Sequence, residues 1–181
     1  MGRRRLAALL TSALVTGLLV GAVPASDAGT PDTEATAVVE TTPAGSAGDT
    51  VDDMAIWVNP ADPAGSLVIG ADHSSGELEV YDLAGERLSG VRLPDANNVD
   101  LRTGFMLGGA SEAIVGVAGG GSTDGRLTFF RINAVTRQLE NVTVGGSYKV
   151  PSANGFCMYH SAVSGKFYAF RTTPAGKVQQ Y

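Results

Sequence analysis

The sequence predicts an all-β fold, and two observations carry that prediction. A short pattern, Gly-x-[Leu/Val]-x-x-[Tyr/Phe], occurs three times, at Gly76–Tyr81, Gly125–Phe130 and Gly176–Tyr181, with its glycines 49 and 51 residues apart. Around each copy, short runs of alternating apolar and polar residues are separated by glycine-rich turns, which is typical of β-strands. A repeat of about 50 residues built from such strands is typical of the blades of a β-propeller.

The predicted strands follow the same order in each repeat. They lie at residues 55–58, 66–70, 77–82 and 87–93 in the first repeat, at 99–101, 113–118, 126–132 and 138–144 in the second, and at 155–159, 166–171 and 177–181 in the third. No helix is predicted beyond the N-terminal 25 residues. A β-sandwich is the alternative all-β fold, but it does not account for the long repeat.

The number of repeats bears on how much of a domain is present. A closed propeller needs about four to eight blades, whereas residues 49–181 hold about two and a half repeats. We therefore expect this segment to be the truncated, N-terminal part of a propeller domain from a longer protein.

The N-terminal residues carry the features of an export signal. Three arginines, at positions 3 to 5, precede an apolar run from Leu6 to Val23, and Val23-Pro24-Ala25 is a small-residue cleavage site. We expect a signal peptide at residues 1–25, and so a secreted protein. Residues 26–48, which are rich in Thr, Ala, Pro, Asp and Glu, are expected to form a flexible acidic leader.

The charge balance excludes some classes of partner. Loss of residues 1–25 removes three of the 13 basic residues and none of the 18 acidic ones, which leaves a net charge of −8. Such a surface repels nucleic acids and anionic membranes, whereas it suits hard cations such as Ca²⁺. The single cysteine, Cys157, lies in an apolar run and is expected to be a small buried hydrophobe rather than a nucleophile.

Polar residues stand where the first strand of each repeat begins. Asp52-Asp53 begins the first repeat, the segment 97–100 (Asn-Asn-Val-Asp) begins the second, and Asn154 begins the third. In a propeller these starts come together at one end of the central channel, so their oxygen atoms could surround a Ca²⁺ ion, which takes six to eight such ligands. Alone, each acidic pair or asparagine pair is more typical of an ordinary turn, and only their occurrence in the same phase of the repeat favours a metal site.

The same segments resemble the β-propeller phytases. The resemblance rests on the Asp-Asp-x-Ala-Ile-Trp and Asn-Asn-Val-Asp elements together, and it extends in order from residue 49 to residue 181 through the segments 52–60, 78–85, 97–102, 154–161 and 165–170. The resemblance implies a six-bladed propeller. It also implies a Ca²⁺-dependent phosphomonoesterase that hydrolyses phytate, or another phosphorylated small molecule, by attack of a metal-activated water.

The resemblance further implies a metal site. Asp52 matches a carboxylate that binds an active-site calcium, so it is the expected catalytic residue. Asp53 matches a ligand of a structural calcium, with Met54 and Val99 where backbone carbonyls help to hold that ion. Asn154 stands where a tyrosine helps to form the calcium site.

The phosphate-binding positions depart from the family. His73 stands where the family has a phosphate-binding lysine, Gly121 where it has an arginine, and Pro174 where it has a further lysine. Neither Gly121 nor Pro174 offers a cationic side chain. Arg171 is a candidate to compensate, although an arginine on a strand is usually solvated.

The leading expectation is thus a secreted, monomeric, Ca²⁺-dependent phytase, inactive as the isolated chain. One alternative is a secreted propeller that has lost catalysis and binds calcium or another ligand. The other is a Ca²⁺-dependent esterase or phosphodiesterase on the same scaffold, acting on a less charged substrate.

Overall fold

The computed structural model describes residues 35–45, 50–120, 125–152 and 154–181. The chain divides into two units, Met1–Thr36 and Ala37–Tyr181, and all the strands described below lie in the second. The predicted signal peptide lies outside the described residues. Within those residues, no helix is long and apolar enough to span a membrane.

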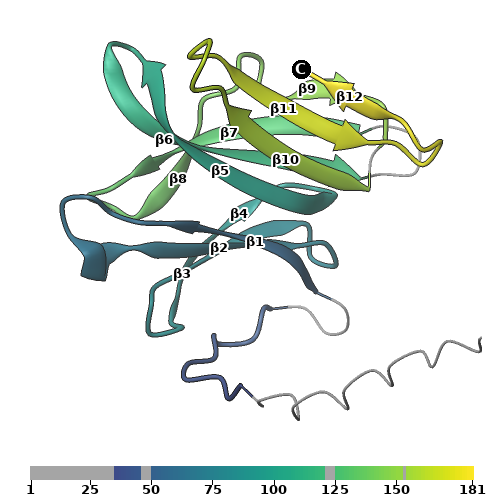
Figure 1. Ribbon diagram of the computed structural model, residues 1–181. Helices are drawn as coiled ribbons and strands as arrows, with labels where there is room; N and C mark the ends of the chain where they lie inside the picture. The colour runs from purple at the N-terminus through teal and green to yellow at the C-terminus, as the bar shows by residue number, and fades with distance from the viewer. Residues whose placement is uncertain (1–34, 46–49, 121–124, 153) are drawn as a thin grey trace, which may run out of the picture. The chain divides into compact units, whose positions relative to one another are not determined.

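Three antiparallel sheets make up the second unit (Figure 1). The first has the order β1 (Val51–Trp57), β2 (Leu67–Asp72), β3 (Glu77–Tyr81) and β4 (Arg87–Arg92). The second has the order β5 (Ala96–Leu107), β6 (Ala110–Gly120), β7 (Gly125–Asn133) and β8 (Gln138–Asn141), with β9 (Tyr148–Val150) also paired to β7. The third has the order β10 (Gly155–His160), β11 (Phe167–Thr172) and β12 (Val178–Gln180).

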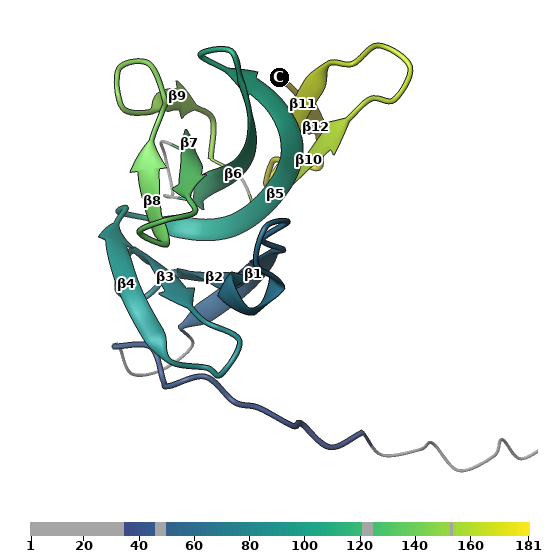
Figure 2. The same ribbon diagram turned by 90° about the vertical axis from the view of Figure 1, so that its left-hand side faces the viewer.

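The all-β prediction is confirmed, since the one helical element of the described residues is a single 3₁₀ turn, Pro63–Gly65. Each sheet runs strand by strand along the sequence, as a propeller blade does. The strands β5 and β6 are longer than predicted because they continue into a hairpin. Figure 2 shows the strong curvature of β5. The pairing of β5 with β6 shifts register between Arg102 and Phe105, which marks a bulge in the strand.

The outer edge of the second sheet is divided between two strands. The end of β7 pairs with β8, through Phe130 to Asn133, whereas its beginning pairs with β9, through Gly125 to Leu127. The prediction of one continuous strand at 138–144 is therefore wrong. The chain leaves the sheet after Asn141, whose side chain donates to the Gly146 carbonyl at 2.9 Å, and returns at Tyr148.

The main core lies between the first and second sheets. Its members alternate along the strands, so each sheet gives one apolar face. They are Ala55, Trp57, Leu67, Ile69, Ala71, Leu78, Val80, Ala96, Val99, Val115, Val117, Phe130, Ile132 and Leu139. This packing fixes β5 against β1, the contact on which the candidate site depends.

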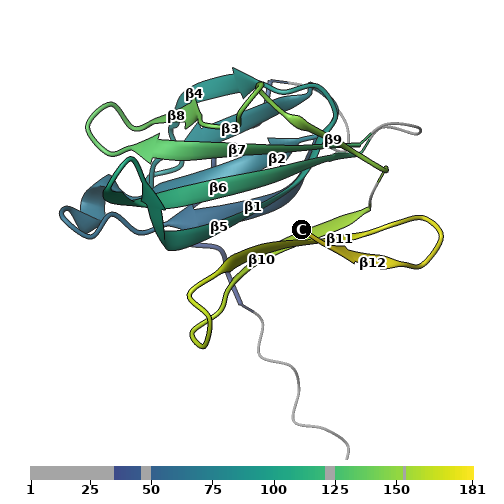
Figure 3. The same ribbon diagram turned by 90° about the horizontal axis from the view of Figure 1, so that it is seen from above.

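The third sheet packs on the opposite face of the second, with β10 against β5 and β6 (Figure 3). A Cβ atom at Gly116 of β6 would lie 2.5 Å from the Met158 sulfur and 2.8 Å from the Phe156 ring. The absence of a side chain at Gly116 therefore allows β10 to approach the second sheet closely.

The three glycines of the repeated pattern meet different requirements. Gly76 and Gly176 have φ values of +66° and +74°, in the left-handed region that glycine adopts without strain. Gly125 does not have a positive φ; instead, a Cβ atom there would lie 2.5 Å from both the Pro151 carbonyl oxygen and the Arg171 guanidinium. The requirement at Gly125 is thus one of space.

The described part of the leader, residues 35–45, forms no helix or strand and is mostly exposed. It contacts the first sheet at one point, where the Thr42 amide donates to the Gly85 carbonyl at 2.8 Å. A Cβ atom at Gly85 would collide with the Glu40 carbonyl, so this glycine permits the leader to lie across the turn.

Candidate metal centre at the strand starts

The starts of β1 and β5 are joined by two hydrogen bonds. The Asn97 side-chain amide donates to Asp52 Oδ2 at 3.1 Å, and the Val99 backbone amide donates to Asp53 Oδ2 at 3.1 Å. The Met54 amide donates to the other oxygen, Asp53 Oδ1, at 2.9 Å. The predicted convergence of the first two strand starts is therefore confirmed, although they are separated by about 45 residues of chain.

The atoms gathered there suit a hard cation. Asp52 is exposed and Asp53 is half-buried, so one of the two carboxylates at this strand start is fully accessible to solvent. On β5, between Asn97 and Val99, the Asn98 Oδ1 atom is buried and has no hydrogen-bond partner among the described residues. Calcium prefers such an all-oxygen set, and an orphaned buried acceptor is a group that a cation would satisfy. The residues present therefore fit Ca²⁺.

The set is nevertheless small. Among the described residues, no group of three Asp, Glu, His or Cys side chains could enclose an ion. Further ligands would have to be backbone carbonyls, such as those of Met54 and Val99, or oxygen atoms outside the described residues. Asn154 is exposed, and its backbone amide donates to the Thr172 carbonyl at 3.2 Å. The structure places Asn154 directly before β10, without a described contact to Asp52 or Asp53.

Asp100 has a different role from the one suggested by the Asn-Asn-Val-Asp element. Its Oδ2 accepts the Met158 amide of β10 at 2.7 Å, and its Oδ1 accepts the Leu101 amide at 2.7 Å and the Arg102 guanidinium at 2.6 Å. The bond from the Met158 amide joins β5 to β10, and the Arg102 guanidinium balances the charge of the Asp100 carboxylate. Sequence reasoning missed this contact, since the donor lies 58 residues away.

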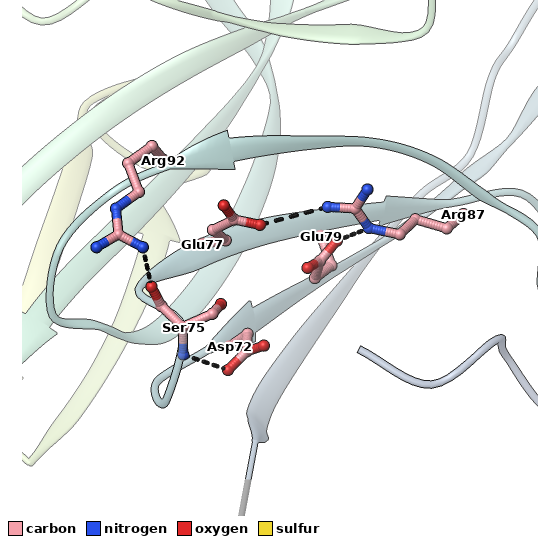
Figure 4. A network of polar contacts seen from close by, with 6 residues as sticks. All are labelled: Asp72, Ser75, Glu77, Glu79, Arg87 and Arg92. Carbon is pink, nitrogen blue, oxygen red and sulfur yellow. Dashed lines mark hydrogen bonds and ion pairs between the residues drawn. The ribbon is translucent and has the colours of Figure 1, made fainter. Parts of the chain in front are cut away.

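His73 lies in the exposed turn between β2 and β3. Its backbone amide donates to the Thr50 carbonyl at 2.8 Å, so the turn lies beside the chain that leads into Asp52. Two contacts hold the turn in shape: the Ser75 amide donates to Asp72 Oδ1 at 2.9 Å, and the Arg92 guanidinium donates to the Ser75 carbonyl (Figure 4). The predicted substrate-binding histidine is thus near the candidate metal centre.

An ion pair between a buried carboxylate and a partly exposed guanidinium lies on the same sheet. The Glu79 carboxylate is completely buried on β3, and the Arg87 guanidinium of β4 donates to its Oε2 (Figure 4). Arg87 also reaches Glu77 Oε2 at 3.3 Å. The hydrogen bond to Glu79 raises the pKa of Arg87, and burial, followed by the nearby Glu79 charge, raises the pKa of Tyr81. Glu79 Oε1 and the Tyr81 hydroxyl have no hydrogen-bond partner among the described residues.

Arg171, the second candidate for binding substrate, is buried. Its exposed fraction is 1%, so the expectation of a solvated strand arginine is wrong. Its Nη2 donates to the Gly119 carbonyl at 3.4 Å, and it occupies the space that Gly125 leaves open. Burial lowers the pKa of Arg171, and Tyr181 opposes that shift. In this arrangement Arg171 packs between the second and third sheets and does not reach solvent.

Three other positions complete the comparison with the predictions. Cys157 is exposed, so the prediction of a buried cysteine is wrong; it lies on the face of β10 opposite to buried Met158. Pro174 is exposed in the turn between β11 and β12. Gly121 lies outside the described residues.

An apolar cavity of about 500 Å³ opens between the second and third sheets. Phe105, Phe129, Tyr148 and Phe167 are among its lining residues, and no Asp or Glu of the described part of the chain lines it. The cavity is therefore separate from the candidate metal centre and does not suit a phosphorylated substrate.

Comparison with known proteins agrees with the motifs at these strand starts. A model of the phytase family matches residues 4–181. Among curated proteins, the chain is similar to the 3-phytase of Bacillus subtilis (strain 168), with 35% identity over 149 residues. That alignment covers 81% of this chain and 39% of the Bacillus protein, so the chain spans about two fifths of the length of this relative.

Proposed function

This chain belongs to the phytase family, and we propose that it forms the N-terminal part of a secreted, monomeric, Ca²⁺-dependent phosphomonoesterase that acts on phytate. The observation that carries the proposal is the pairing of Asp52 and Asp53 with Asn97 and Val99 across two sheets. This pairing sets oxygen ligands from separate segments beside one another. Secretion follows from the proposed signal peptide at residues 1–25.

The residues at the strand starts have different proposed roles. When bound, Ca²⁺ supplies a Lewis acid for the phosphoryl oxygens, an activated water, and a positive charge in an otherwise acidic protein. Asp52, which is exposed, would hold the ion that contacts substrate, so it is the proposed catalytic residue. Asp53 and the carbonyls of Met54 and Val99 would hold a second, structural ion, with an oxygen from Asn154, the residue before β10.

Substrate binding in this proposal depends on few cationic side chains. His73 is proposed to donate an imidazole N–H to a phosphate group. Arg171 contributes directly only if the contact between the second and third sheets opens, because it is buried. Most of the attraction for a polyanion therefore has to come from bound Ca²⁺.

A second function is favoured by this scarcity of accessible cationic side chains. With Arg171 buried and Pro174 uncharged, the phosphate contacts are weak, as they would be in a secreted propeller that binds calcium without catalysis. Phosphate release from phytate, measured with and without a chelator on the product of the whole reading frame, separates the two functions. Chelator-sensitive release supports the phytase. Stabilisation by Ca²⁺ without release at any Ca²⁺ concentration supports the binding protein, and release from a neutral ester alone supports the esterase.

We expect Asp53→Asn to lower the affinity of the chain for Ca²⁺ by at least about tenfold, because a charged ligand becomes a neutral amide. Isothermal calorimetry with CaCl₂ measures this affinity. Asp62→Asn is the matched control, since Asp62 is exposed in the loop at the opposite end of β1 and undergoes the same loss of charge. Equal affinities in the two variants would contradict the proposed site.

A further inference from the structure

Two aspartates make the same pair of hydrogen bonds at successive junctions between sheets. Asp53 accepts the amide of the next residue, Met54, through Oδ1 at 2.9 Å, and the amide of Val99 on the following sheet through Oδ2 at 3.1 Å. Asp100 accepts the amide of its next residue through Oδ1 at 2.7 Å, and the amide of Met158 on the following sheet through Oδ2 at 2.7 Å. Each carboxylate thus bridges two first strands, β1 to β5 and then β5 to β10.

The two bridges lie at different depths. Asp53 is in line with Leu78 across the first sheet, and Asn98 is in line with Leu127 across the second. Because Leu78 and Leu127 hold the same place in the repeated pattern, Asn98 corresponds to Asp53. Asp100 is two residues further along its strand, or about 7 Å deeper. The second bridge is therefore withdrawn from the strand starts, where the candidate ligands lie.

The backbone of β5 between the two bridges carries a candidate ligand. The Val99 amide is held by Asp53 from one side, and the Asp100 side chain is held by Met158 from the other. The Val99 carbonyl belongs to the peptide group that joins Val99 to Asp100. Its direction is consequently set by both bridges, and a carbonyl must point within a narrow range of angles to bind a cation.

We propose that Asp100 is a positioning residue of the metal centre: it orients the Val99 carbonyl and aligns β10, which follows Asn154, without binding the ion. This inference rests on the proposed function. The chemistry of Asp100 supports it, since its two oxygens already accept three N–H donors and its charge is balanced by Arg102. A carboxylate so engaged is a poor ligand but a rigid support.

The experiment compares Ca²⁺ binding by the wild-type chain and Asp100→Asn, using CaCl₂ as the probe in calorimetry at a temperature where both are folded. Asparagine has one acceptor oxygen in place of two, so one of the bridge contacts is lost. We expect affinity to fall about tenfold, with an unchanged number of bound ions, as is typical for the loss of a group that supports a ligand.

Two controls separate positioning from a general loss of stability. Arg102→Met removes the ion pair but leaves the bond from Met158 to Asp100 in place. Thr143→Val removes the hydroxyl that accepts the Phe129 amide at 2.6 Å, and so weakens the outer edge of the second sheet, away from the strand starts. We expect both variants to bind Ca²⁺ with wild-type affinity, although both are less stable.

Each other outcome overturns the inference. Wild-type affinity in Asp100→Asn, alongside weaker binding by Asp53→Asn, would leave the metal centre standing and remove Asp100 from it. Fewer bound ions in Asp100→Asn would make Asp100 a ligand rather than a support. Equal weakening in Thr143→Val would reduce the effect to stability, and the absence of Ca²⁺ binding by the wild type would overturn the proposed function as well.

Discussion

Arg87→Met is expected to lower the free energy of unfolding by about 3 kcal/mol, because it leaves the carboxylate of Glu79 buried without a counter-ion. Glu79 is completely buried, and its Oε1 already lacks a hydrogen-bond partner among the described residues. We place the effect at the lower end of the range for buried pairs because the Arg87 side chain is 39% exposed and water reaches it. Urea denaturation followed by the fluorescence of buried Trp57 measures the change.

Two variants sharpen this prediction. Arg92→Met removes an arginine from the same strand whose guanidinium donates to the Ser75 carbonyl and forms no ion pair among the described residues, so we expect a loss of at most about 1 kcal/mol. The double variant Glu79→Met, Arg87→Met removes both charges, and we expect it to recover most of the lost stability. A loss in Arg87→Met no greater than that in Arg92→Met would show that the buried pair does not stabilise the first sheet.

Gly125→Ala is expected to destabilise the chain by about 1–3 kcal/mol, the usual effect of an added methyl group in a filled interior. The new Cβ atom would lie 2.5 Å from the Pro151 carbonyl oxygen, which belongs to the backbone and cannot rotate away. It would lie equally close to the Arg171 guanidinium, so the second and third sheets would separate locally. The same denaturation experiment measures the change.

The comparison that identifies the cause uses Arg171→Met in a double-mutant cycle. If the methyl group acts partly through the guanidinium, the double variant is less unstable than the sum of the single variants. Gly176→Ala is the control for backbone strain, since that glycine has a φ of +74° and nothing within 4 Å of its Cβ position. Its cost should be about 1–2 kcal/mol, and independent of Arg171. Additivity at Gly125 would assign the whole effect to Pro151.

The fold was largely predictable because its signals are local. Alternation of apolar and polar residues marks the strands, and the glycines of the repeated pattern mark the turns, so the order of strands in each sheet follows from the sequence. The division of the outer edge between β8 and β9 was not predictable, since residues 138–144 are uniformly compatible with a strand. There the break depends on the Asn141 side chain, which binds the loop that follows it.

The candidate site was predictable to the extent that it depends on the repeat. Asp52 and Asp53 meet Asn97 and Val99 because equivalent starts of neighbouring sheets lie together. Contacts that break the equivalence could not be foreseen. Asp100 accepts the amide of Met158, which lies two positions further along its strand than the repeat alone would place the partner.

Arg171 and Cys157 show the same limit for single residues. Arg171 is buried because a glycine 46 residues earlier in the chain leaves room for its guanidinium. Cys157 is exposed because alternation on β10 turns it away from Met158. In both, the local sequence is apolar, and which face of the strand is covered depends on the packing of distant segments.

The divided edge of the second sheet also bears on solubility. A free edge strand offers a row of unpaired N–H and C=O groups on which another chain can extend the sheet. Here that row is interrupted between Asn141 and Tyr148, so an incoming strand can match only four residues or three before it meets the loop. On the first sheet, β4 carries Arg87 and Arg92 and a register shift beside Tyr81. These two edges are thus poor templates for intermolecular β-sheet growth, which would otherwise compete with folding.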